Sequence, residues 1–401
     1  MNQATCRIAL TLAALLASTA ALAETQAVTP YADIRYRLEL VDQDGLAEQA
    51  AASTLRVKAG VKTAVWHGFS AVVEGEAIVV LGETSYNDTV NGKTIYPVVA
   101  DPSDILLNQA YLRWRPAAQL ELTGGRQAVN LDNQRWIGSV GWRQNDQTLD
   151  AVRVTARPVK GSSVDYLYAW RVNRVFGPDS PQGIWRDTEI HAVRAAYTIK
   201  NVGALSAYGY WLDIPSQPSS SSRILGVRMA GEHPVGGKST FLYAAEYARQ
   251  HDHGANPRSF GLDYWLIEPG VKTGPLTFKA GYERLEGNGT VGLQTPLATL
   301  HAFNGWADKF LTTPANGLRD AYLDASYKVP GMGALAGLTL RAAWHDYGST
   351  VGGIAYGREW NALASYPLDK RFTLTAKLAR YEADGFATDT TKLWFQVEAK
   401  F

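Results

Sequence analysis

The sequence is poor in cysteine and in charge of either sign. Its 401 residues contain one cysteine, Cys6, and charged residues make up 19% of the chain, below the usual quarter. Cys6 lies in a segment that we expect to be removed, so the mature chain has no thiol for a disulfide, a zinc ligand or a nucleophile. Lysine and arginine total 39 against 38 for aspartate and glutamate, which argues against a nucleic-acid partner.

Long apolar runs are missing after the N-terminus. No stretch beyond residue 23 approaches the ~18 apolar residues that a membrane-spanning helix needs. The first residues hold Arg7, an apolar run from Ile8 to Leu16 and a small-x-small site at 21–23. This pattern predicts a secretory signal peptide over residues 1–23, cleaved before Glu24, with an N-terminal membrane anchor as the alternative. Residues 24–401 then form one exported domain.

Alternation of apolar and polar residues dominates this domain. In the last segment, Leu393, Phe395 and Val397 fall on one face, while Lys392 and Gln396 fall on the other. A period of two indicates β-strands. A soluble sandwich and a membrane barrel share the period, but a barrel turns its apolar face to lipid and its charged face to the lumen.

Strand number and connection length distinguish these two architectures. The pattern predicts eighteen strands, over residues 31–42, 53–65, 68–80, 105–116, 118–128, 147–157, 162–172, 188–199, 203–213, 223–233, 238–250, 258–271, 275–286, 319–329, 336–347, 355–366, 371–382 and 391–401. Tight turns alternate with longer loops such as 81–104, 129–146, 172–187 and 287–318. Short turns on one side and long loops on the other are typical of an outer-membrane barrel. We therefore predict an all-β protein, a closed antiparallel transmembrane β-barrel with short periplasmic turns and long extracellular loops.

Strand parity assigns most charged side chains to the lumen. The predicted inward cations are Arg35, Arg37, Arg56, Lys58, Arg113, Arg115, Arg153, Arg171, Arg194, Arg228, Lys279, Arg341 and Lys377. The predicted inward anions are Glu39, Glu74, Glu76, Asp165, Glu246, Glu283, Asp324, Glu359 and Glu398. A lumen of this width holds water, and fixed charges in it set ion preference. The inward set leans cationic, which predicts an anion-selective path for anionic or polyhydroxylated solutes. Mutual pairing that braces the wall is the alternative.

The longest loop, 287–318, is unusually apolar for a surface segment. It contains Leu297, Leu300, Phe303, Trp306 and Phe310. We expect such a loop to fold inward or to pack on its neighbours and narrow the pore. A simple lid over the mouth is the alternative.

Three loop segments resemble the alginate-export family of outer-membrane proteins. They are VVADPSDILLNQAYL (98–112), GRQAVNLDNQRWIGSVGWRQNDQTLDAVR (125–153) and QTPLATLHAFNGWADKFLTTPANGLRD (294–320). The resemblance implies an eighteen-stranded barrel with an electropositive, passive pore through which an anionic polyuronate is exported. Its pore contributors would be Arg113, Arg126, Asp132, Arg135, Arg143, Asp150, Arg153, His301, Asn304, Asp308 and Lys309, with Trp306 in the same constriction loop. Arg126 falls on the outward face by parity, and a bulge at Gly124–Gly125 would return it inward.

One departure from that family favours a different cargo. The alginate exporter has a sizeable late periplasmic turn that helps to plug its pore, whereas Pro367–Lys370 is tight here. A general or small-carboxylate uptake porin of the same fold is therefore the alternative function. The resemblance and the signal peptide together place the chain in the Gram-negative outer membrane. Expected partners are the bilayer with its lipopolysaccharide, an anionic polysaccharide or small anion, and the barrel-assembly and periplasmic export machineries.

An outer-membrane enzyme and an adhesin are the rival classes. The best catalytic or metal-binding cluster is His251-Asp252-His253, near Glu246 and Asp263. Two imidazoles could bind a metal, but no third ligand is fixed by spacing, and a solvated loop tip is the simpler interpretation. No glycine-rich phosphate loop is present. We expect no enzyme activity, no metal and no cofactor.

Overall fold

A computed structural model describes residues 27–401 except 83 and 332, so the predicted signal peptide lies outside the described residues. The strands are Val28–Gln43 (β1), Ala50–Thr63 (β2), Phe69–Val80 (β3), Asp104–Ala117 (β4), Leu120–Gln127 (β5), Thr148–Ala156 (β6), Ser162–Asn173 (β7), Ile184–Ile199 (β8), Gly203–Asp213 (β9), Ser222–Gly236 (β10), Ser239–Asp252 (β11), Gly261–Thr273 (β12), Leu276–Leu285 (β13), Leu318–Lys328 (β14), Thr339–Gly348 (β15), Ala355–Pro367 (β16), Phe372–Ala383 (β17) and Thr390–Lys400 (β18). Two 3-10 turns, Pro218–Ser220 (η1) and Leu300–Ala302 (η2), lie in loops.

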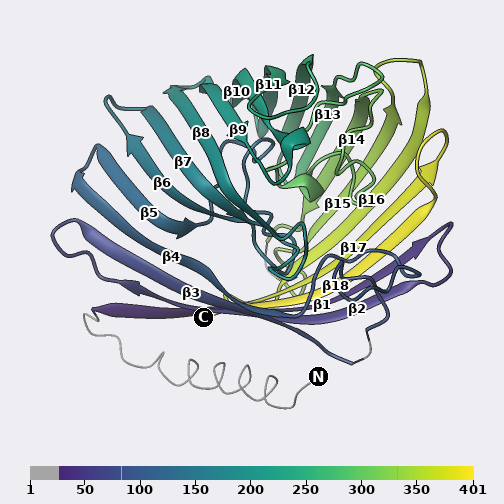
Figure 1. Cartoon of the computed structure of the whole chain (residues 1–401), viewed down its shortest axis with the longest axis horizontal. Helices are drawn as coiled ribbons and strands as arrows, with labels where there is room; N and C mark the ends of the chain where they lie inside the picture. The colour runs from purple at the N-terminus through teal and green to yellow at the C-terminus, as the bar shows by residue number, and fades with distance from the viewer. Residues whose placement is uncertain (1–26, 83, 332) are drawn as a thin grey trace.

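The strands form one closed sheet (Figure 1). Each strand pairs antiparallel with its neighbours in sequence, and β1 also pairs with β18, from Asp33 opposite Lys400 to Gln43 opposite Thr390. Closure leaves no strand with an unpaired edge, which hydrocarbon could not satisfy. The predicted eighteen-stranded closed antiparallel barrel is confirmed. Within the described residues, no helix is long and apolar enough to cross a bilayer.

The connections alternate in length as the sequence predicts. Short turns such as 118–119, 237–238 and 274–275 lie at one end, while the loops 81–103, 128–147 and 286–317 lie at the other. One even connection is longer, at 329–338, because β15 begins at Thr339 and not at residue 336. Strand β8 begins at Ile184, four residues earlier than predicted. A register shift between Ala169 and Arg171 accommodates this extension.

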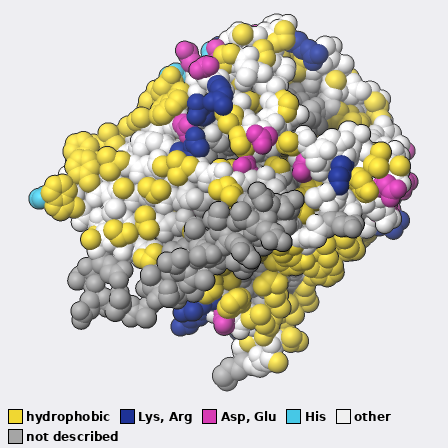
Figure 2. All heavy atoms as spheres, turned by 60° about the horizontal axis from the view of Figure 1, so that its bottom comes forward, with side chains coloured by type: hydrophobic (Ala, Val, Ile, Leu, Met, Phe, Trp, Pro, Cys, Tyr) yellow, Lys and Arg dark blue, Asp and Glu magenta, His cyan; other side chains and the backbone are white. Residues whose placement is uncertain are grey.

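The two faces of the strands differ in chemistry. On β10, Leu225 and Val227 are 55% and 49% exposed on the outer face, while the alternate residue Ile224 is 1% exposed. Exposed aromatic side chains such as Trp114, Tyr197 and Tyr327 lie on that outer face too. Hydrophobic side chains gather over the outer wall in Figure 2. This is the inverted pattern of a barrel that turns its apolar side chains to lipid.

Candidate functional site: a lumen narrowed by two inward loops

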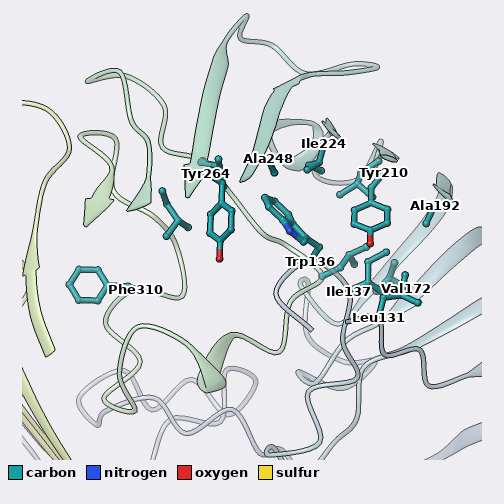
Figure 3. Packing of buried hydrophobic residues seen from close by; sticks show 14 of the residues in the cluster. Leu131, Trp136, Ile137, Val172, Ala192, Tyr210, Ile224, Ala248, Tyr264 and Phe310 are labelled. Atoms are coloured by element: carbon teal, nitrogen blue, oxygen red, sulfur yellow. The ribbon is translucent and has the colours of Figure 1, made fainter. Parts of the chain in front are cut away.

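Two long loops, 128–147 and 286–317, fold into the barrel and fill part of its lumen (Figure 1). Their apolar residues Trp136, Ile137, Leu297 and Phe310 are buried in one cluster with lumen-facing strand residues such as Tyr264. Figure 3 shows Trp136 between the rings of Tyr264 and Tyr210. Burial of this apolar surface holds the loops inside the barrel and away from the solvent above it.

Backbone hydrogen bonds join the two loops to each other. Ile137 and Leu297 form a parallel bridge. The Gly138 amide donates to the Leu297 carbonyl at 2.9 Å, and the Thr299 amide donates to the Gln134 carbonyl at 3.0 Å. The loops are therefore one body that narrows the channel.

Arginines of β1 hold the tip of loop 128–147. Arg35 Nη1 donates to the carbonyls of Gly141, Trp142 and Arg143 at 3.0, 3.3 and 3.3 Å. Arg37 Nη2 donates to the Trp142 carbonyl at 2.5 Å, and its guanidinium lies 4.2 Å from the centre of the Trp142 ring. Both side chains are buried. They anchor the loop, and the prediction that they line an open solute path is wrong.

The neighbouring cations on β2 are also bound by protein carboxylates. Arg56 pairs with Asp33 at 2.6 Å, and Lys58 Nζ donates to Asp146 of the loop at 2.5 Å. Both cations are buried. Burial alone would raise the pKa of Asp146, but the Lys58 ammonium and its hydrogen bond hold that pKa below its usual value. Lys58 thus braces the loop against the wall, while Arg56 is held by a carboxylate of β1, and neither cation is free to meet a solute.

Asp308 is the hub of loop 286–317. Its carboxylate accepts from Arg143 at 2.8 Å, from Lys392 at 2.9 Å and from His301 Nδ1 at 2.7 Å. Burial lowers the pKa of His301 to about 3, so the imidazole is neutral at physiological pH. The neutral ring donates through Nδ1 and accepts from Lys377 Nζ through Nε2 at 2.6 Å. The pKa of Asp308 is held well below its usual value, against the effect of burial, by the hydrogen bond from His301 and by the charges of Lys392 and Arg143.

Arg135 connects the loops to the opposite wall. Its Nε lies 2.9 Å from Glu283, and its Nη2 donates to Asn304 Oδ1 at 3.0 Å. Asn304 Nδ2 in turn donates to Glu283 at 2.6 Å and to Asp320 at 3.1 Å. The structure thus brings Arg135, Asn304 and Glu283 together, in a buried polar network.

A separate group of arginines lies open to water on the β4–β8 wall. The side chains of Arg115, Arg113 and Arg153 are 54%, 33% and 28% exposed. Arg113 and Arg115 share the single carboxylate of Glu121, at 3.5 and 2.5 Å, while Arg153 pairs with Asp165 at 2.6 Å. One guanidinium charge therefore exceeds the carboxylates at this point of the wall.

Arg194 continues this wall on β8. It binds Asp132 of loop 128–147 through two nitrogens at 2.8 and 2.6 Å, and it lies 3.4 Å from Asp165. Asp132 has a positive φ of 47°. The Arg194–Asp132 pair fastens the start of the loop to the wall.

Loop 286–317 separates two cavities. The lower one, of about 530 Å³, is lined by Phe303 and Trp306 of the loop and by Arg228, Lys279 and Arg341 of the wall. Each of these cations has a carboxylate partner: Glu246 at 2.7 Å, Glu268 at 2.8 Å and Asp324 at 2.6 Å. None of these three cations of the lower cavity therefore lacks a protein carboxylate.

The upper cavity, of about 380 Å³, opens on the loop side. Apolar residues including Tyr96, Phe176 and Leu300 line it together with Lys309 and Arg143. Burial lowers the pKa of Lys309 to about 8, and the nearby Lys392 ammonium adds to this effect. The loop segment 298–309 contributes residues to both cavities, and it is thus the partition between them.

Three predicted pore residues lie on the lipid-facing side. Arg126 lies opposite Ala110 on one side and opposite Asp150 on the other. Asp150 in turn lies opposite Arg171. The strand pairing has no register shift at Gly124–Gly125, so the expected bulge is not formed. Without that bulge Arg126 keeps outward parity, and Asp150 shares a face with Val152, which is 42% exposed. Arg126 and Asp150 form a two-pronged ion pair at 2.6 and 3.0 Å. The placement of Arg126, Asp150 and Arg171 in the lumen is wrong.

Sequence reasoning missed several residues of the loop anchors. Trp142 stacks on His301 with ring centres 4.9 Å apart, and Trp394 meets both rings at their edges. Lys392 and Asp146 supply ion pairs to the inner loops. Strand parity could have placed Lys392 in the lumen, because the next residue on β18, Leu393, faces outward. The partners of Trp142 and Asp146 are set by loop folding, which no local pattern records.

Residues of the histidine cluster take part in local hydrogen bonds. His251 accepts a hydrogen bond from Arg249, and Asp252 accepts from Ser259 Oγ and from the Phe260 amide. Among the residues that the structure describes, no group of three or more histidines, cysteines and carboxylates is arranged to hold a metal ion.

Comparison with known proteins identifies the class. The family model described as Gram-negative porin matches residues 9–386, and the chain belongs to this family. The fold and the family place the chain in the outer membrane as a channel-forming barrel. The family description names a Gram-negative porin and does not name alginate export, so the comparison supports the porin barrel that the loop resemblance implied.

Solved structures share the fold. OpdL of Pseudomonas aeruginosa matches with a TM-score of 0.72 and 18% identity over 93% of this chain and 98% of its own. OccAB3 of Acinetobacter baumannii matches with a TM-score of 0.72 and 14% identity over 93% of this chain and 99% of its own. OpdK of Pseudomonas aeruginosa, in a structure with vanillate, has a TM-score of 0.71 and 15% identity over 93% and 98%. A search of curated proteins found no matching sequence.

Proposed function

We propose that this porin is a passive uptake channel for small anionic solutes, with carboxylates as the solute class. The observation that carries the proposal is the water-exposed group Arg113, Arg115 and Arg153, in which two guanidinium groups share one carboxylate. The other inward arginines near the loops are buried or fully paired. A guanidinium that faces water and lacks a full protein partner presents a fork that matches a solute carboxylate.

The size of the path supports small solutes. Two loops occupy the lumen, and the segment 298–309 divides it into cavities of about 530 and 380 Å³. Such volumes are of the size that holds a small molecule. Export of a polyuronate would require a wider continuous path or removal of the loops. One structural neighbour was solved with vanillate, a small aromatic carboxylate, and the aromatic lining of the upper cavity suits a solute of that kind.

The proposal is tested by solute block in a planar bilayer. We expect small carboxylates to reduce the current of the refolded mature chain in the millimolar range or below, while neutral sugars of similar size leave it unchanged. Equal block by both solutes would remove the arginine group from the selectivity mechanism. Block by oligouronates alone would restore the export hypothesis.

A further inference from the structure

Besides the cations of the lumen, two arginines lie on the outer, lipid-facing surface of the barrel near the long loops, where charged side chains are unfavourable. Arg284 near the end of β13 and Arg319 near the start of β14 face each other directly across the two strands. Arg284 shares its face with Tyr282, which is 42% exposed, and Arg319 shares its face with Leu323, which is 57% exposed. Both arginines therefore point outward, close to the extracellular end of the barrel.

A directly opposed pair of like charges is unfavourable in a sheet. Glu286 pairs with Arg284 at 3.0 Å and also accepts from the Asp263 amide at 2.8 Å. Arg319 has no ion pair among the residues that the structure describes. The pair therefore keeps one uncompensated positive charge on the outer wall.

In the lumen, a similar pair of opposed arginines is neutralised by carboxylates of the protein itself. Arg35 and Arg56 are also directly opposite each other, on β1 and β2. Glu398 lies 3.4 Å from Arg35 and 3.9 Å from Arg56, and Asp33 lies 2.6 Å from Arg56. The outward pair lacks an equivalent set of carboxylates, which leaves room for an anion from outside the protein.

An apolar groove lies on the same outer face, farther from the loops. It has a volume of about 690 Å³, and Ala280, Ala325 and Ala342 are among its lining residues, with Trp344 and Trp360 on one flank. Small side chains between large ones leave a channel that fits an acyl chain. Leu323, which also lines the groove, is four residues from Arg319 along β14, about 13 Å at the usual rise per residue. A lipid with an anionic head could contact the arginines and the groove together.

A second outward pair repeats the feature on another part of the wall. Arg171 of β7 is directly opposite Arg186 of β8. Asp150 lies 3.6 Å from Arg171 but is already bound through two oxygens to Arg126. Arg186 is exposed and has no ion pair among the described residues.

We propose that the outward pair Arg284–Arg319 and the adjoining groove bind the phosphorylated, acylated lipid A portion of lipopolysaccharide. The pair lies at the extracellular end, where the outer leaflet carries lipid A phosphates. Guanidinium groups bind phosphate oxygens through two nitrogens, and basic pockets at this depth bind lipid head groups. The phosphate supplies the negative charge that the arginine pair lacks, and an acyl chain covers the alanine floor.

Native mass spectrometry of the refolded mature barrel with lipid A tests the proposal. We expect R284Q/R319Q to bind lipid A about tenfold more weakly, since hydrogen bonds between charged groups are the strong ones. Lipid A without its phosphates should bind wild type as weakly as the variant does. The control R157Q/K160Q removes two cations from the 157–161 turn at the other end of the barrel and should bind lipid A as wild type does.

A second variant tests whether the groove contributes to binding. A second lipid, phosphatidylglycerol, tests whether the site prefers lipid A over another anionic phospholipid. Ala325→Phe fills the groove and should weaken binding while the arginines stay intact. Phosphatidylglycerol should bind no more tightly to wild type than to R284Q/R319Q. Equal affinity of wild type for lipid A and its dephosphorylated form would overturn the proposal, even if the variants fail to fold. A tenfold preference for phosphatidylglycerol over lipid A would overturn it as well.

Discussion

At the scale of single residues, strand parity says which side a charge faces but not whether water reaches it. Arg37 and Arg113 both have inward parity, yet Arg37 is fully buried under Trp142 and Arg113 is 33% exposed. The difference comes from loop 128–147, whose tip binds Arg37 of β1 and leaves Arg113, near the end of β4, open to water. Selectivity should therefore depend on the few arginines that remain exposed.

We expect R113A/R153A to lower anion preference. Removing two exposed guanidinium groups leaves Glu121 with Arg115 alone and Asp165 with Arg194 alone. Because Arg194 also binds Asp132, the carboxylates then outnumber the cations and the local potential becomes negative. In a KCl gradient, the reversal potential should move toward zero or change sign. The control R358A/R380A removes two exposed arginines from the outer wall and should leave the potential unchanged. An unchanged potential in R113A/R153A would exclude these residues from the filter.

Lys309 gives a pH dependence at the upper cavity. Its pKa is lowered to about 8, so the ammonium is charged at neutral pH and loses its proton as the pH rises through that value. Anion preference should fall between about pH 7 and about pH 9 in wild type. The K309Q channel, which has no charge at this position, should show at both pH values the reduced anion preference that wild type reaches at about pH 9. A wild-type preference that is flat over this range would contradict a role for Lys309.

At the scale of elements, the strands were predictable and the inner loops were not. Alternation and turn length gave all eighteen strands because each strand has one lipid face and one lumen face. The predicted strand ends differ from the observed ones where the pairing is irregular. Strand β8, for example, begins earlier than predicted, and its pairing with β7 has a register shift between Ala169 and Arg171. The apolar content of the 287–318 segment indicated burial, but its partner, the bridge between Ile137 and Leu297, joins segments far apart in sequence. Such pairing has no local signature.

Deleting residues 295–313 should raise single-channel conductance severalfold. This segment contains the partition between the two cavities and the hub residue Asp308, so its removal widens the narrowest part of the path. The D308N variant, which keeps the loop but weakens its ion pairs, should give a noisier current with a smaller change in mean conductance. A deletion variant that folds and conducts as wild type does would show that the constriction lies elsewhere.

Cross-linking tests whether the two loops act as one body. The only cysteine is Cys6, inside the predicted signal peptide, so I137C/L297C introduces the only pair of thiols into the mature chain. We expect the two positions to form a disulfide, because an isolated parallel β-bridge between the loops holds them side by side. The oxidised channel should keep wild-type conductance and recover no extra current on reduction. A large gain of current on reduction would show that the loops separate during conduction.

At the scale of the whole molecule, the chain is a porin barrel whose narrowing is built from its own loops. The lumen carries charges of both signs, and most of them are used in ion pairs. Some of these pairs join neighbouring strands, and others fix loops 128–147 and 286–317. The predicted electropositive lumen is therefore reduced to a local excess near Arg113 and Arg115. The motif resemblance implied an eighteen-stranded barrel, which the structure has. It could not give the cargo, which depends on the few side chains left free.

The most direct test of passive conduction of small anions is single-channel recording of the refolded mature chain in a KCl gradient, followed by addition of small carboxylates. The account predicts a reversal potential of the sign for chloride preference, and current block by small carboxylates that R113A/R153A relieves. A cation-selective channel, or one that small carboxylates do not block, would contradict it.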